Sequence, residues 1–184
     1  MTRVWKRPIA DVRACGYADA MISTDALFRI ADAAEEAGNY DLAIQSFERG
    51  ASLGDSSCLC RLALLFDVGI GVESDKTTAM RLYRRAWRID RNTVAGGNIA
   101  ILYRERRNWR QTFRWWKRVA QLGDGSAELE LAKCYLRGQG VRRDPQAALR
   151  CLAVAEGSTY ITEYERELAR RLLRRLRPRG LGSC

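Results

Sequence analysis

The sequence repeats itself at a distance of 69 residues, and this internal symmetry restricts the folds that the chain can adopt. A shift of 69 positions places Leu53-Gly54-Asp55 on Leu122-Gly123-Asp124. The same shift places Gly69-x-Gly71-Val72-x2-Asp75 on Gly138-x-Gly140-Val141-x2-Asp144. Repeats of this kind are typical of stacked supersecondary units, each of which buries its apolar face on its neighbours.

Each half of the chain divides again into two units, because a small–large–small pattern recurs every 33 to 36 residues. Residues that lie four and three positions apart share one face of a helix, so the large side chain fills the space that the small ones leave. Each unit also has an apolar run before this pattern, which indicates that another helix precedes the patterned one. One small residue lies in each of these earlier runs: Ala31, Ala63, Ala100 and Ala132. The patterns themselves are Ala43-x3-Phe47-x2-Gly50, Ala79-x3-Tyr83-x2-Ala86, Thr112-x3-Trp116-x2-Val119 and Ala148-x3-Leu152-x2-Ala155.

Two kinds of connection alternate between the predicted helices. Units one and three have short turns at 38–40 and 107–109, whereas units two and four have longer loops at 69–75 and 138–144. The glycines of the longer loops allow positive φ at the end of the first helix. Asp75 and Asp144 are predicted to cap the second helix, and Pro145 to take its first position.

The run Leu131-Ala132-x2-Tyr135-x2-Gly138-x-Gly140-Val141-x2-Asp144-x3-Ala148 resembles the signature of the Sel1-like repeat, a relative of the tetratricopeptide repeat (TPR). The resemblance covers residues 25–157. It implies an all-α, right-handed α-solenoid of about four helix-turn-helix repeats with N- and C-terminal capping helices. Residues 1–24 are then an N-terminal capping segment, and residues 158–184 are a basic C-terminal capping helix and tail.

The periodicity predicts the helix positions and no strand of four or more residues. The expected helices cover residues 8–21, 25–37, 41–53, 57–68, 76–89, 94–106, 109–122, 126–137, 145–156 and 159–175. In the last helix, Leu168, Leu172 and Leu176 share one face, which we expect to pack on unit four. The alternative for this arginine-rich helix is contact with an anionic membrane or nucleic acid.

The composition argues against an enzyme. The chain has no histidine, which removes His-based acid/base catalysis and every His-containing metal site. Gly69-x-Gly71 is not followed by the G-K-[ST] of a phosphate loop. We therefore predict no catalytic residues, no metal and no cofactor.

The cysteines and the hydropathy pattern predict a cytoplasmic protein. The six cysteines include no C-x-x-C pair, and we expect Cys58, Cys134 and Cys151 to be buried free thiols. No apolar stretch is long enough to span a membrane, and the N-terminus lacks the apolar region of a signal peptide.

In TPR-like arrays, the first helix of each hairpin lines a concave groove, so the resemblance implies a partner-binding site there. The implied positions form an acidic wall, an apolar floor and a basic end, which favours a partner with an acidic segment. The alternative is that they are ordinary solvated helix faces. The candidate residues are Phe28, Asp32, Glu35, Leu64, Asp67, Ile101, Arg104, Leu129, Lys133 and Arg137.

A second candidate feature is the aromatic and arginine-rich run at 109–118. Interleaved Arg and Trp can stack on nucleic acid bases. However, Trp109, Phe113 and Trp116 align with packing positions of the first unit, so we expect them in the core. Trp115 is the one that we expect at the surface.

Two functions follow from these features. The first is a protein-interaction scaffold or adaptor that binds one protein partner in its groove, including a stoichiometric inhibitor such as a bacterial toxin-immunity protein. The second is a nucleic-acid-binding module that uses the arginine-rich face of repeats two and three. Of the 32 basic residues 28 are Arg, a bias that a GC-rich genome also produces, and residues 1–55 are net acidic. Both observations favour the scaffold.

Overall fold

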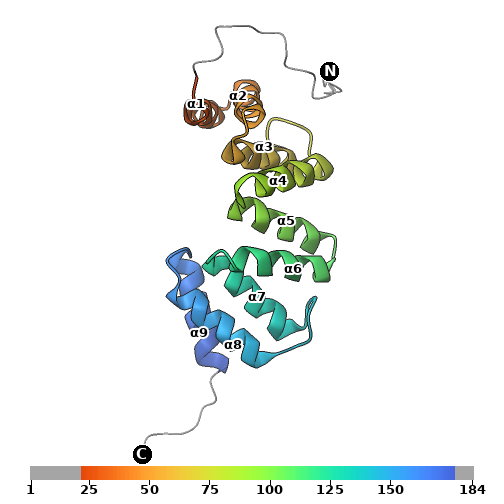
Figure 1. The fold of residues 1–184 in the computed structure, drawn as a ribbon, viewed down its shortest axis with the longest axis vertical. Coiled ribbons are helices and arrows are strands. Elements are labelled where there is room, and N and C mark those ends of the chain that lie inside the picture. The colour runs from red at the N-terminus through yellow and green to blue at the C-terminus, as the bar shows by residue number, and fades with distance from the viewer. Residues whose placement is uncertain (1–21, 177–184) are drawn as a thin grey trace, which may run out of the picture.

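The computed structural model describes residues 22–176, which form α-helices and their connections without a β-strand (Figure 1). This confirms the predicted all-α solenoid. The helix predicted over residues 8–21, together with Cys15 and Cys184, lies outside the described residues. The helices are α1 (Thr24–Glu36), α2 (Tyr40–Ser52), α3 (Ser56–Val68), α4 (Lys76–Asp90), α5 (Thr93–Glu105), α6 (Trp109–Ala120), α7 (Gly125–Arg137), α8 (Pro145–Gly157) and α9 (Glu163–Leu176).

The helices pair into four hairpins that stack in chain order. Helices α1 and α2, α3 and α4, α5 and α6, and α7 and α8 form the hairpins, and each second helix packs on the first helix of the next. Helix α9 lies against α8 at the far end of the array from α1 (Figure 1). Each hairpin therefore depends on its neighbours for its buried surface.

The predicted caps and glycine turns are present in the longer loops. The side chain of Asp75 accepts hydrogen bonds from the backbone N–H groups of Thr77 and Thr78 at 2.9 and 3.0 Å. Asp144 caps α8 in the same way, and Pro145 is the first residue of that helix. The chain leaves α3 and α7 through glycines in the left-handed region, Gly69 at φ 86° and Gly138 at φ 69°.

Helix α9 begins at Glu163, later than the predicted residue 159, because a capping box fixes its start. The Glu165 N–H donates to the Thr162 hydroxyl, and the Glu165 carboxylate accepts from the Thr162 N–H, each at 3.2 Å. The apolar stripe of α9 packs on α8 as predicted, although its most buried members are Ala169 and Leu173 rather than the three leucines.

The small–large–small positions form the core as predicted. Phe47, Tyr83 and Leu152 are completely buried, and the small residues that flank them are buried as well. Cys58 and Cys134 are buried free thiols and Cys151 is half-buried. Burial raises the pKa of Cys58 to about 12 and that of Cys134 to about 11, so both remain uncharged at neutral pH.

The prediction that Trp115 lies at the surface is wrong. Its side chain is 7% exposed, and its ring packs edge-to-face on Trp87 of α4 with the ring centroids 5.3 Å apart. The guanidinium of Arg118 covers the ring at 4.8 Å. Close packing of α4, α5 and α6 explains this, because a Cβ atom at Gly96 would lie only 2.6 Å from both Trp87 and Val119.

The two neighbouring glycines of α5 should respond in opposite ways to the same change. Gly96→Ala is expected to destabilise the protein by about 1–3 kcal/mol, because the new methyl group meets a rigid indole and a buried valine. Gly97→Ala should stabilise it by up to about 1 kcal/mol, because its methyl group finds ordinary contacts at 3.4 Å or more and alanine favours a helix. Chemical denaturation of both variants measures the difference. Equal stability of the two would contradict the packing described here.

Candidate functional site

Charged side chains on the first helices of the hairpins, α1, α3, α5 and α7, form one candidate surface, here called the groove face. Four of its six predicted charges form ion pairs, three of them with another helix. The carboxylate of Glu35 on α1 accepts two hydrogen bonds from the guanidinium of Arg61 on α3, at 2.9 and 2.7 Å. This bidentate pair ties the first hairpin to the second.

Asp67 and Glu105 both form an ion pair with the same lysine, Lys76. The ammonium of Lys76 at the start of α4 lies 2.8 Å from Asp67 and 2.9 Å from Glu105. Hydrogen bonds to these two carboxylates raise the pKa of Lys76. The three residues come from three successive helices, so the network links the second hairpin to the third.

The predicted basic end of the groove face is partly neutralised by Glu130, a residue that the sequence analysis did not single out. Its carboxylate lies 2.6 Å from Lys133 and 3.4 Å from Arg104. The sequence does contain a signal for Glu130. The 69-residue shift aligns Glu35 with Arg104 and Arg61 with Glu130, so the two pairs occupy equivalent positions. The same inter-repeat ion pair therefore occurs in both halves of the chain with its signs exchanged.

The apolar candidates of the groove face divide into two groups. Phe28, Leu64 and Ile101 are half-buried, and Phe28 packs edge-to-face on Phe47 at 5.6 Å. Leu129 is 1% exposed and belongs to the core between α7, α8 and α9. Its predicted place in the groove is wrong, because the capping helix adds a layer against this end of the array.

Two charged candidates of the groove face are unpaired within residues 22–176. Asp32 is half-buried and Arg137 is exposed, and neither makes an ion pair or hydrogen bond with another described side chain. They lie toward opposite ends of the groove face, on α1 and α7. The other four charged candidates of the groove face are paired with neighbouring side chains.

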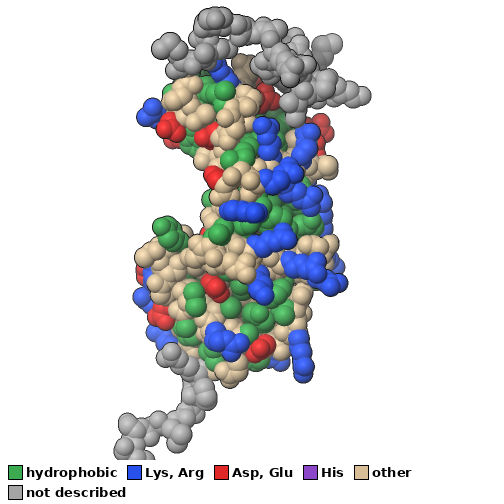
Figure 2. Space-filling view, viewed as in Figure 1, with side chains coloured by type: hydrophobic (Ala, Val, Ile, Leu, Met, Phe, Trp, Pro, Cys, Tyr) green, Lys and Arg blue, Asp and Glu red, His purple; other side chains and the backbone are tan. Residues whose placement is uncertain are grey.

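The second candidate surface is formed by α4 and α6, the second helices of the middle hairpins. Helix α4 has five basic residues and one acidic residue, and α6 has four basic residues and no acidic one. Figure 2 shows the Lys and Arg side chains gathered at the level of α3 to α6, with few Asp or Glu side chains among them. In the sequence, these arginines indicated only the alternative function, binding of nucleic acid.

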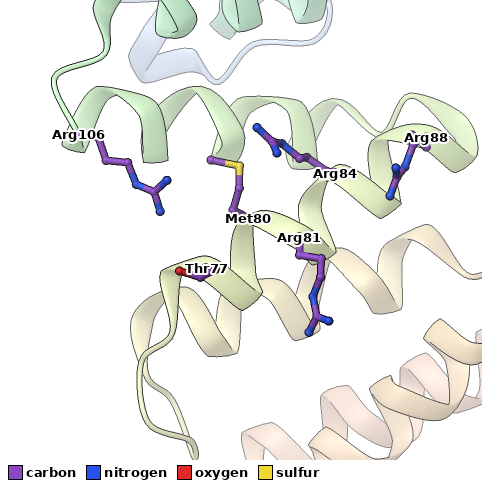
Figure 3. A pocket seen from close by; sticks show the side chains of 6 residues that line it. All are labelled: Thr77, Met80, Arg81, Arg84, Arg88 and Arg106. Atoms are coloured by element: carbon purple, nitrogen blue, oxygen red, sulfur yellow. The ribbon is translucent and has the colours of Figure 1, made fainter. Parts of the chain in front are cut away.

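A depression of about 400 Å³ lies on this surface and is lined mainly by arginines. Thr77 and Met80 lie on the first turns of α4, and Arg106 reaches toward them from the end of α5 (Figure 3). Further along α4, three arginines recur at spacings of three and four residues, which places them on one side of the helix. We call the six lining residues the arginine face: Thr77, Met80, Arg81, Arg84, Arg88 and Arg106.

No carboxylate lines the arginine face. Arg84 donates a hydrogen bond of 2.5 Å to the hydroxyl of Tyr103, a neutral partner that orients the guanidinium without cancelling its charge. The side chains of Arg81, Arg88 and Arg106 make no hydrogen bond or ion pair with another residue of the described range. Arg81 interacts electrostatically with Asp75 at the start of α4, but no carboxylate lies among the residues that line the depression.

The part of the chain that the structure describes contains no cluster of three or more His, Cys, Asp or Glu side chains arranged to hold a metal ion. None of its helices has the length and apolar character needed to cross a membrane.

Comparison with known proteins identifies the repeats. The Sel1 repeat family model matches residues 56–86 and 125–155, which correspond to the hairpins α3/α4 and α7/α8. The chain therefore contains Sel1 repeats, which confirms the resemblance noted in the sequence. Repeats of this class are typical of protein-interaction scaffolds rather than of catalytic domains.

Solved structures support the same fold. A Sel1 repeat protein from Oxalobacter formigenes is 22% identical with a TM-score of 0.67, and covers 76% of this chain. The protective antigen c5321 of uropathogenic Escherichia coli, which has an SLR fold, is 23% identical with a TM-score of 0.65, and covers 73%. This chain spans 60% and 30% of the lengths of those two proteins. A comparison with curated proteins returns no match.

The inter-repeat ion pairs should make small, measurable contributions to stability. A double-mutant cycle with Glu35→Gln and Arg61→Gln is expected to give a coupling of about 0.5–1 kcal/mol that falls as salt is added, because the pair is bidentate but partly exposed. The same cycle with Glu167→Gln and Arg174→Gln is the control, and its coupling should be close to zero, since both side chains are more than half exposed. Equal couplings would refute the role assigned to the Glu35–Arg61 pair.

Proposed function

We propose that the chain is a protein-interaction scaffold that binds one protein partner across its groove face, and that this partner carries an acidic segment. The observation that carries the proposal is the row of half-buried apolar side chains on successive first helices, Phe28, Leu64 and Ile101. Apolar anchors of this kind usually dominate affinity at protein interfaces.

The paired charges on either side of this row support the proposal through preorganisation. Because Glu35, Asp67 and Glu130 are already bound to cations on neighbouring helices, the first helices are held in fixed positions before a partner arrives. A rigid surface loses less conformational entropy on binding. The free charge of Arg137 at one end favours a carboxylate of the partner there.

We propose no activity for the scaffold other than binding. All described helices are used in the array, so the chain acts on its partner by covering a surface. A cytoplasmic stoichiometric inhibitor, such as a bacterial immunity protein that covers a toxin, is the role to test first. An immunity protein from Pseudomonas aeruginosa is among the matching structures, but its TM-score of 0.41 is too low to carry an argument.

Ile101→Asp is expected to weaken binding of the partner by at least about 30-fold, because it places a charge in the centre of the apolar row. The partner is first recovered by affinity capture from the native host and identified by mass spectrometry, and then titrated by calorimetry. Val154→Asp is the control, since Val154 is 54% exposed and lies on α8, a second helix that does not belong to the groove face. Wild-type affinity of a folded Ile101→Asp variant would exclude the groove face.

Arg137→Glu is expected to act on the kinetics of association. The side chain is exposed at the edge of the groove face, so reversal of its charge should slow association several-fold and reduce the salt dependence of the rate, with little change in dissociation. Surface plasmon resonance at two salt concentrations measures both rates. A change confined to the dissociation rate would contradict an edge position.

A further inference from the structure

We propose that the arginine face is a second docking site, and that it binds a run of Asp and Glu side chains from a protein segment. This inference rests on the proposed role as a protein-interaction scaffold, but it uses a different surface. It assigns to α4 and the end of α5 the recognition of acidic side chains, whereas the groove face supplies the apolar contacts.

The first argument is the contrast in charge compensation between the two surfaces. On the groove face, Glu35, Asp67, Arg104 and Lys133 all have partners of opposite charge. Four guanidinium groups surround the depression on the arginine face, and no carboxylate lines it. Because no carboxylate lines the depression, an incoming anionic group can contact these guanidinium groups without displacing an existing partner there.

The second argument is the arrangement of the donors. Arg81 and Arg88 are seven residues apart on one helix with Arg84 between them, so their Cα atoms span about 10 Å along its axis. Carboxylates at positions i, i+3 and i+7 of a partner helix have the same spacing. A guanidinium binds a carboxylate through two parallel hydrogen bonds, and Tyr103 already holds that of Arg84 in position.

The third argument favours a protein segment over a nucleic acid. The nearest indole rings, Trp87 and Trp115, are only 6% and 7% exposed, and Arg91 and Arg118 cover their faces. The faces of these two indole rings are therefore not available for stacking with bases. Met80 lines the depression and offers an apolar contact, which a partner helix uses better than a phosphodiester backbone.

Fluorescence anisotropy with a labelled oligoglutamate of about 15 residues tests the proposal, at low salt where charge interactions are least screened. The variant Arg81→Gln/Arg84→Gln/Arg88→Gln is expected to bind this probe at least about tenfold more weakly than the wild type. The control Arg142→Gln/Arg143→Gln/Arg150→Gln removes the same charge from the fourth hairpin, and its affinity should change less than about twofold. Circular dichroism melts establish that both variants are folded.

Three results would overturn the proposal. The first is an equal loss of affinity in the two triple variants, which would mean attraction by net charge alone. The second is tighter binding of a random-sequence DNA duplex that depends on the same three arginines, which would make the surface a nucleic acid site and remove support for the scaffold as well. The third is a wild-type protein that does not bind oligoglutamate at low salt.

Ile101→Asp separates this proposal from the groove face. If oligoglutamate binding is lost in Ile101→Asp and kept in the α4 triple variant, the arginine face is excluded while the scaffold stands. If the natural partner still binds Ile101→Asp with wild-type affinity and the α4 triple variant loses the probe, the groove face fails and the arginine face stands.

Discussion

The array depends on close contact between neighbouring helices at small residues. Gly50 lies so close to Cys58 that a Cβ atom there would overlap the sulfur, and Gly96 allows Trp87 and Val119 to meet across α5. Without these small positions, the large side chains of the next helix could not enter the interface, and the apolar face of each hairpin would remain exposed to water. The inter-repeat ion pairs and both candidate surfaces exist because this packing fixes the spacing of the hairpins.

Most of the fold could be predicted from the sequence because its determinants are local and recur in each repeat. The small–large–small spacing, the capping aspartates at Asp75 and Asp144 and the glycines that end α3 and α7 act within a few residues, so each could be recognised by comparing one unit with another. The start of α9 was missed because it depends on a single capping box, Thr162 with Glu165, that has no counterpart in the rest of residues 22–176.

The candidate sites were harder to predict, because exposure depends on what neighbouring helices cover. Periodicity alone predicts that Trp115 and Leu129 lie on exposed helix faces. In the structure, Trp87 packs on Trp115, and α9 helps to bury Leu129. The groove charges were assigned correctly to the first helices, but the pairing of Glu35 with Arg61 and of Arg104 with Glu130 depends on the distance between hairpins. The arginines of α4 that line the depression differ from the paired residues of the groove face because their side chains form no ion pair within residues 22–176. This difference depends on the three-dimensional positions of the carboxylates.

The exchanged signs of the two equivalent ion pairs have a consequence for the order in which the chain assembles. If the first hairpin stacked on the fourth, or the third on the second, Glu35 would face Glu130, or Arg104 would face Arg61. Two like charges would then lie where the correct order places a hydrogen-bonded pair. A pair that adds little to the free energy of unfolding can thus discriminate between near-identical repeats, and so disfavour stacking of the hairpins in the wrong order.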